Sequence, residues 1–94
     1  MSTKIQFRER EMREAIASMQ QSCKKLDEMN QYFMERAGWA EKEALQGEAG
    51  ISLKNAITGK LCPSISQLSI AIGEQVKFAQ IELDQMIKAA SQLR

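Results

Sequence analysis

The chain has 94 residues, with 13 Lys and Arg against 12 Asp and Glu, no His, two Cys and one Pro. A formal net charge of +1 argues against a nucleic-acid-binding protein, which concentrates Lys and Arg to neutralise phosphates. Without His there is no Ser-His or Cys-His nucleophile pair, and two Cys alone do not complete a zinc site. We therefore expect one small domain that is not an enzyme, with no catalytic residue, no metal and no cofactor.

The first half of the chain has the spacing of a long amphipathic helix, predicted over residues of about 4–36. Apolar residues recur there in steps of three and four, which is the spacing of coiled-coil packing. We call this row the seam, because it should face another helix. The seam comprises Ile5, Met12, Ile16, Met19, Cys23, Leu26 and Phe33, with Asn30 at its one polar position.

A turn is predicted over about 37–43, where Gly38 and Trp39 interrupt the apolar pattern. Glycine supplies backbone conformations that end helices, and a turn here leaves two helices of nearly equal length. We expect Trp39 to cover the open end of the hairpin by packing against the start of the second helix.

A second long helix is predicted over about 44–93. Pro63 lies within it, lacks an N–H group and crowds the carbonyl of Gly59, so a bend is expected near 59–63. The seam of this helix comprises Ile57, Leu61, Ile65, Leu68, Ile72, Val76, Ala79, Leu83, Met86, Ala90 and Leu93.

Folding the chain about this turn lets the two seams meet and predicts an all-α fold, an antiparallel two-helix hairpin. The register places Cys23 near Leu61, Met19 near Ile65, Ile16 near Leu68 and Met12 near Ile72. Cys23 and Cys62 then fall close together. Cytoplasmic synthesis and apolar neighbours nevertheless favour two reduced cysteines over a disulfide.

Apolar residues outside the seams indicate a partner. A two-helix hairpin has a single internal seam, so the spare apolar residues suggest a second apolar face that completes a four-helix bundle with another protein. Ile70, Phe78 and Ile81 are the candidate partner face. The full off-seam set comprises Phe7, Met29, Tyr32, Met34, Ile70, Phe78, Ile81 and Ile87.

The segment Leu45-Gln46-Gly47 opens the second helix, after Trp39 and ahead of Pro63. With the long first helix, this arrangement resembles the WXG/ESX superfamily of type VII secretion over nearly the whole chain. It is closer to the LXG domains of Gram-positive toxins and to the small proteins that accompany them. Trp39 is followed by Ala40, so the glycine of the family motif comes from Gly38 or from the L-x-G at Gly47.

The resemblance implies a small type VIIb secretion protein that binds the helical domain of an LXG toxin and helps target it for export. A second small helical protein could complete the complex. Family members carry an export signal, an aromatic residue followed four residues later by an acid, which the secretion ATPase would recognise. Phe78 and Glu82 match this spacing and share one helix surface.

The expected location is the cytoplasm, and whether the protein is itself exported by type VII secretion with its cargo is left open. No stretch approaches the roughly 18 uninterrupted apolar residues that span a bilayer, and the first 13 residues alternate charges where a signal peptide has an apolar core. Two alternative functions remain open. One is a small secreted WXG-like homodimer, and the other is a self-assembling structural hairpin such as a needle or filament subunit.

Overall fold

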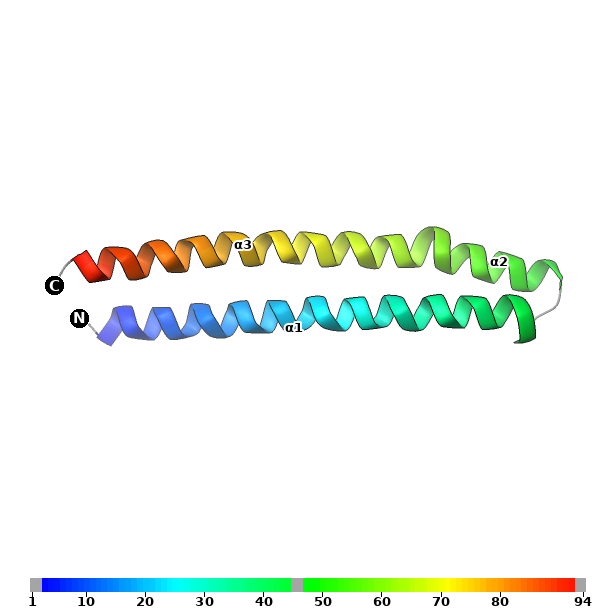
Figure 1. Ribbon diagram of the computed structural model, residues 1–94, viewed down its shortest axis with the longest axis horizontal. Helices are drawn as coiled ribbons and strands as arrows, with labels where there is room; N and C mark the ends of the chain where they lie inside the picture. The colour runs from blue at the N-terminus through cyan, green and yellow to red at the C-terminus, as the bar shows by residue number, and fades with distance from the viewer. Residues whose placement is uncertain (1–2, 45–46, 93–94) are drawn as a thin grey trace.

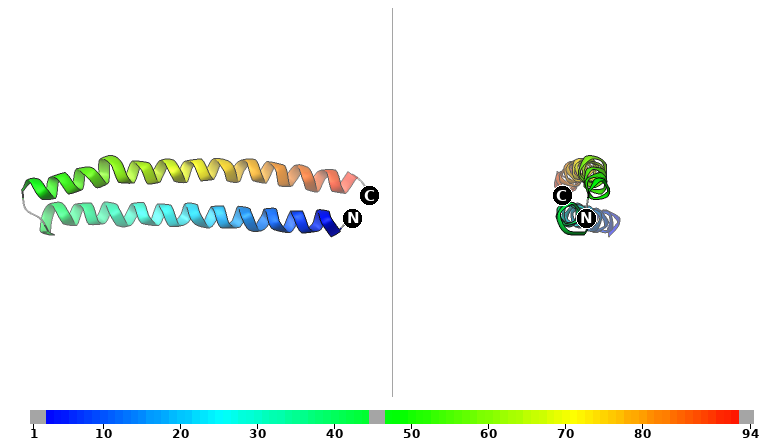
Figure 2. Two further views of the ribbon diagram at one scale, coloured as in Figure 1. Left: turned by 180° about the vertical axis from the view of Figure 1, so that it is seen from behind. Right: turned by 90° about the vertical axis from the view of Figure 1, so that its right-hand side faces the viewer.

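The protein is an extended hairpin of two long helical arms. A computed structural model describes residues 3–44 and 47–92. The arms run side by side in opposite directions, which brings both ends of the chain together at one end of a rod measuring 70 × 16 × 13 Å (Figures 1 and 2). The predicted all-α hairpin is therefore confirmed. In chain order the elements are α1 (Thr3–Trp39), the π-helical turn η1 (Ala40–Ala44), α2 (Glu48–Ala56), the π-helical turn η2 (Ile57–Leu61) and α3 (Cys62–Gln92).

The chain reverses later than the sequence predicts. Residues 37–44 are helical rather than a turn, Gly38 and Trp39 belong to the end of α1, and α2 begins at Glu48 rather than near residue 44. Gly47 immediately precedes α2 with φ +72° and ψ −144°, a backbone conformation that residues with a side chain rarely adopt. A glycine inside a helix costs only about 1 kcal/mol relative to alanine, so Gly38 alone does not end one.

Small side chains let the two arms approach each other near the turn. Ala37 and Ala40 of the first arm and Gly50 of the second are buried. An ion pair between Glu41 and Lys54, with 3.2 Å from Oε2 to Nζ, links η1 to α2 at the same end. Both side chains of this pair are partly exposed, so its contribution to stability is small.

The register of the hairpin differs from the predicted one. The thiol of Cys23 donates to the carbonyl oxygen of Ser69 at 3.5 Å, eight residues beyond the predicted neighbour Leu61. Ile16 lines a groove with Leu83 rather than lying near Leu68. Moving the turn toward residue 47 slides the second arm along the first. A seam that repeats every seven residues presents apolar side chains in either register, so apolar matching does not distinguish the two.

The observed seams follow a strict alternation of steps of three and four, the spacing of a coiled coil. On α1 the predicted seam is confirmed for the side chains that the structure describes, which excludes Ile5. On the second arm Leu61 of η2 and Leu68 of α3 are exposed, contrary to prediction, and Cys62 and Ser69 take their places. The α3 seam comprises Cys62, Ile65, Ser69, Ile72, Val76, Ala79, Leu83, Met86 and Ala90, and Leu93 lies outside the described residues.

The π-helical turn η2 explains why Leu61 and Leu68 leave the seam. The backbone N–H of Cys62 donates to the carbonyl oxygen of Ile57, five residues earlier, so one extra residue is accommodated in this turn. The seam consequently steps from Ile57 to Cys62 instead of to Leu61. Pro63 follows directly, and its missing N–H favours an irregular turn at the position where the sequence predicts a bend (Figure 1).

Polar groups interrupt the middle of the seam and match the observed register. The amide nitrogen Nδ2 of Asn30 donates to Ser66 Oγ at 2.8 Å, and Ser69 Oγ donates to Asp27 Oδ1 at 3.2 Å. Asn30 Oδ1 is buried without a partner among the described residues. A polar residue in a coiled-coil seam lowers stability but selects the register in which it is hydrogen-bonded. We attribute the selected register to this cluster.

Cys23 and Cys62 are both free, as predicted, although they are not the close pair that the predicted register implied. The thiol of Cys62 lies 3.9 Å from the carbonyl oxygen of Asn30, whereas Cys23 lies against Ser69. Ser69 follows Cys62 by seven residues on one helix, a rise of about 10 Å. That offset exceeds the reach of a disulfide, which needs Cα atoms within about 7 Å.

Candidate protein-binding face

Many large apolar side chains lie on the outside of this hairpin. Among the described residues, only Ile16, Ile65 and Leu83 are large apolar residues that are buried. Two helices in contact bury one stripe each, so the remaining apolar area meets solvent unless a partner covers it. The exposed large apolar residues comprise Phe7, Met29, Tyr32, Met34, Trp39, Ile51, Leu53, Leu61, Leu68, Ile70, Phe78 and Ile81.

Five of these residues gather on one side of the hairpin in the half nearest the turn. Met29 immediately precedes the seam residue Asn30, and Leu68 immediately precedes the seam residue Ser69. Positions just before seam residues on two antiparallel helices lie on the same side of the pair. We call this surface the turn-proximal flank. It comprises Met29, Tyr32 and Trp39 from α1, Leu61 from η2 and Leu68 from α3.

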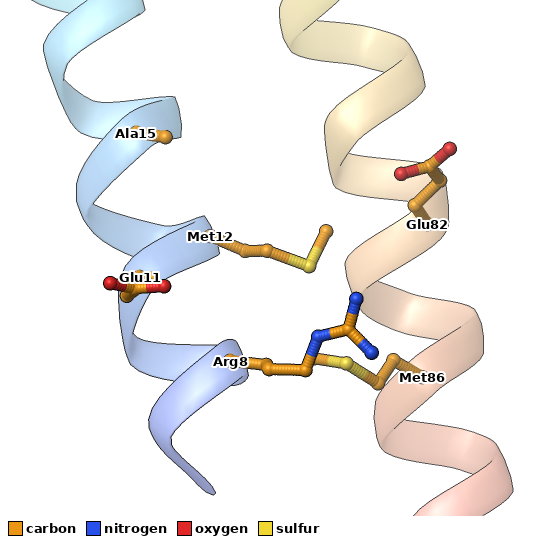
Figure 3. Close-up of a pocket in the computed structure, with 6 residues that line it drawn as sticks. All are labelled: Arg8, Glu11, Met12, Ala15, Glu82 and Met86. Carbon is orange, nitrogen blue, oxygen red and sulfur yellow. The ribbon is translucent and has the colours of Figure 1, made fainter. Parts of the chain in front are cut away.

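The opposite end of the hairpin supports this geometry directly. Glu11, Ala15 and Glu82 each precede a seam residue by one position, and all three line, with Arg8, one groove of about 490 Å³ between α1 and α3. Figure 3 shows Arg8 and Met12 extending from α1 toward α3, with Glu82 and Met86 on the facing helix. The same side of the hairpin is therefore polar near the termini and apolar near the turn.

A cation is held among the aromatic rings of the turn-proximal flank. The guanidinium carbon of Arg36 lies 5.2 Å from the centroid of the Tyr32 ring and 5.6 Å from that of the Trp39 ring. These distances are typical of cation–π contacts. Trp39 is 49% exposed, so it stacks with Arg36 on the surface and leaves much of its ring open to solvent, instead of being sequestered against the second helix as the sequence suggested.

Two residues of the predicted partner face, Ile70 and Ile81, lie on a different surface, whereas Phe78 immediately precedes the seam residue Ala79 and lies on the same side as Leu68, nearer the termini. Ile70, Phe78 and Ile81 are exposed, and at 100° per residue they fall within about 80° of one another on α3. Ile70 immediately follows the seam residue Ser69, whereas Leu68 precedes it, so the two apolar residues flank the seam on opposite sides. Sequence reasoning missed Leu68 as a surface residue because it assigned Leu68 to the internal seam.

The predicted export signal is accessible. Phe78 is 61% exposed, and Glu82 is exposed one helical turn later. The carboxylate of Glu82 lines the groove that Arg8 also lines, and within residues 3–44 and 47–92 it forms no ion pair. Of the predicted L-x-G motif, Leu45 and Gln46 lie outside the described residues, and Gly47 supplies the positive φ at the start of α2.

The described residues contain no group of three His, Cys, Asp or Glu side chains placed to hold a metal ion. Among the described helices, none combines the length and apolar character needed to cross a membrane. Models of protein families, curated proteins and solved structures give no match to this chain.

Proposed function

We propose that this chain is a small non-enzymatic protein of a Gram-positive type VIIb secretion system, which binds the helical domain of an LXG toxin and helps target it for export. The observation that carries the proposal is the exposed apolar surface of an otherwise regular two-helix hairpin. Covering this surface with two helices of a partner would complete a four-helix bundle, in which each helix buries a wider apolar stripe.

A protein partner can bind to the exposed surface of the hairpin without a pocket or a bound group. The turn-proximal flank places apolar and aromatic side chains around Arg36, and tryptophan, tyrosine and arginine are the residues that dominate binding energy at protein interfaces. Both arms contribute to this flank, as expected of a surface that packs against further helices.

Coexpression with the helical domain of an LXG toxin tests the proposal. We expect a stable complex of defined stoichiometry in size-exclusion chromatography with light scattering, and a discrete monomer or dimer for the chain alone. Filaments of the free chain would favour the structural-subunit alternative. A tight dimer of the chain that does not bind the toxin domain would favour the WXG-like homodimer. Either result would overturn the proposed function.

Phe78 and Glu82 are proposed to form the export signal of the complex, which the secretion ATPase would recognise. Phe78 is exposed, so Phe78→Ala should leave the hairpin and the toxin complex intact while reducing toxin export. Secretion is measured by immunoblot of culture supernatants, with Ile81→Ala as the control on the same helix. Unchanged export by the Phe78 variant would remove this residue from the signal.

A further inference from the structure

The turn-proximal flank has a charge pattern that restricts what can cover it. The residues one helical turn from Arg36 are Tyr32, Phe33 and Trp39 of α1 and Ala40 of η1, so no carboxylate occupies the positions three or four residues away that favour an ion pair along a helix. Among the described residues, Arg36 forms no ion pair. Glu41, the nearest acid toward the turn, is paired with Lys54. Within the part of the chain that the structure describes, Arg36 is therefore a positioned cation without a paired carboxylate.

The two aromatic contacts also limit the motion of Arg36. A guanidinium that contacts aromatic rings can still donate its N–H groups to a carboxylate of another molecule. Because the guanidinium is positioned before binding, less side-chain entropy is lost when a partner carboxylate arrives. Met29, seven residues before Arg36 on α1, and Leu68 on the other arm provide apolar area on the same side of the hairpin.

A second copy of this chain fits the flank poorly in either orientation. With the turns at the same end, two apolar flanks would meet. Glu28, the acid beside Met29 and Tyr32, would stay about 12 Å along the helix from either Arg36, so both Arg36 side chains would be buried without a carboxylate. With the turns at opposite ends, Met29 and Leu68 would face the polar half of the same side, where Arg8, Glu11 and Glu82 lie. Neither arrangement satisfies both the apolar area and the charge.

We infer that the turn-proximal flank binds an amphipathic helix of a different protein, one whose apolar stripe is bordered by a carboxylate that pairs with Arg36. The apolar stripe packs on Met29 and Leu68 between the two arms, and the carboxylate reaches Arg36 between Tyr32 and Trp39. This inference deepens the proposed function by naming the surface and the chemistry of its partner, and it rests on that function only for the identity of the partner protein.

Trp39 is the only tryptophan of the chain and reports directly on this surface. The probes are two synthetic helical peptides without tryptophan, with Leu and Ile at every third and fourth position, bordered by Glu in one and by Lys in the other. Titrated into the full chain, the Glu-bordered peptide should shift Trp39 emission to shorter wavelength and bind about tenfold more tightly than the Lys-bordered peptide. Arg36→Gln should reduce that preference to about twofold, while the control Lys88→Gln, an exposed cation on α3, should leave it unchanged.

Other outcomes would overturn the inference. If the two peptides bind equally tightly, or if neither binds, Arg36 does not select an acidic partner. A blue shift of Trp39 with increasing concentration of the chain alone, accompanied by self-association in sedimentation, would assign the flank to a second copy. A blue shift with phosphatidylglycerol vesicles and none with the peptides would assign it to a lipid surface.

The proposed function and this inference can fail separately. If the wild-type and Arg36→Gln chains bind the toxin domain equally well, the proposed function stands and the role inferred for Arg36 is wrong. If the chain selects the Glu-bordered peptide but forms no complex with the toxin domain, the inferred binding surface and its preference for an acidic helix stand, and the LXG toxin is not the partner.

Discussion

Leu83→Ala should destabilise the hairpin more than any comparable truncation on the outer surface. The side chain of Leu83 is 1% exposed, and it is the largest side chain that the described arms bury completely. Truncating a buried leucine costs about 2–5 kcal/mol, a large fraction of the stability of a domain this small. We expect the midpoint of thermal unfolding, followed by circular dichroism at 222 nm, to fall by roughly 10 °C or more.

Ile81→Ala provides the matched control for this prediction. Ile81 lies two residues earlier on the same helix and is 52% exposed, so its truncation should change the free energy of unfolding by no more than about 0.5 kcal/mol. Equal losses from the two variants would show that Ile81 is as buried as Leu83 in solution, for example in a self-assembled form. That result would contradict the isolated hairpin described above.

Leu68→Asp should strongly weaken binding of the proposed helical partner, whereas Ile70→Asp should largely preserve it. Both substitutions place the same charge on exposed positions of α3, two residues apart, so their effects on helix stability should be similar. A carboxylate at Leu68 would be buried against the apolar stripe of the partner. We expect Kd for the toxin domain to rise at least about thirtyfold, the effect of losing about 2 kcal/mol at a central interface residue.

The comparison of these two variants distinguishes the two candidate surfaces. Loss of binding with Ile70→Asp, together with tight binding by Leu68→Asp, would place the partner on the outer side of α3 formed by Ile70, Phe78 and Ile81. Circular dichroism of both free variants establishes that each remains a helical hairpin. Binding is measured by isothermal titration calorimetry with the purified domain.

Long helices and the α1 seam follow from the sequence because a seven-residue apolar repeat is a strong and local signal. The position of the turn does not follow in the same way. Gly38 and Gly47 look alike as residues, and only the backbone angles of Gly47 reveal which one permits the reversal. An error of a few residues in the position of the turn changes every predicted contact between the two arms. Moving the turn by one residue shifts the residue that faces a given position on the first arm by two.

The surface at Leu68 was hidden for a different reason. Leucine is more hydrophobic than cysteine or serine, so the sequence favours Leu61 and Leu68 over Cys62 and Ser69 as seam residues. The extra residue in η2 nevertheless turns Cys62 and Ser69 toward the first arm. A signal for this was present, because regular steps of three and four run from Cys62 to Ala90 without interruption. Hydrogen bonds from Asn30 and Ser69 depend on side-chain placement, which composition and periodicity do not specify.

Methionine footprinting of the partner complex tests most directly whether the turn-proximal flank is the docking surface. Met29 lies on this flank, and Met34 lies on the opposite side of the same helix, where it immediately follows the seam residue Phe33. Both side chains are exposed in the free chain, so peroxide should oxidise both to sulfoxide at similar rates. In the complex we predict that Met29 becomes several-fold slower to oxidise while Met34 is unchanged; protection of Met34 with Met29 still reactive would contradict the account.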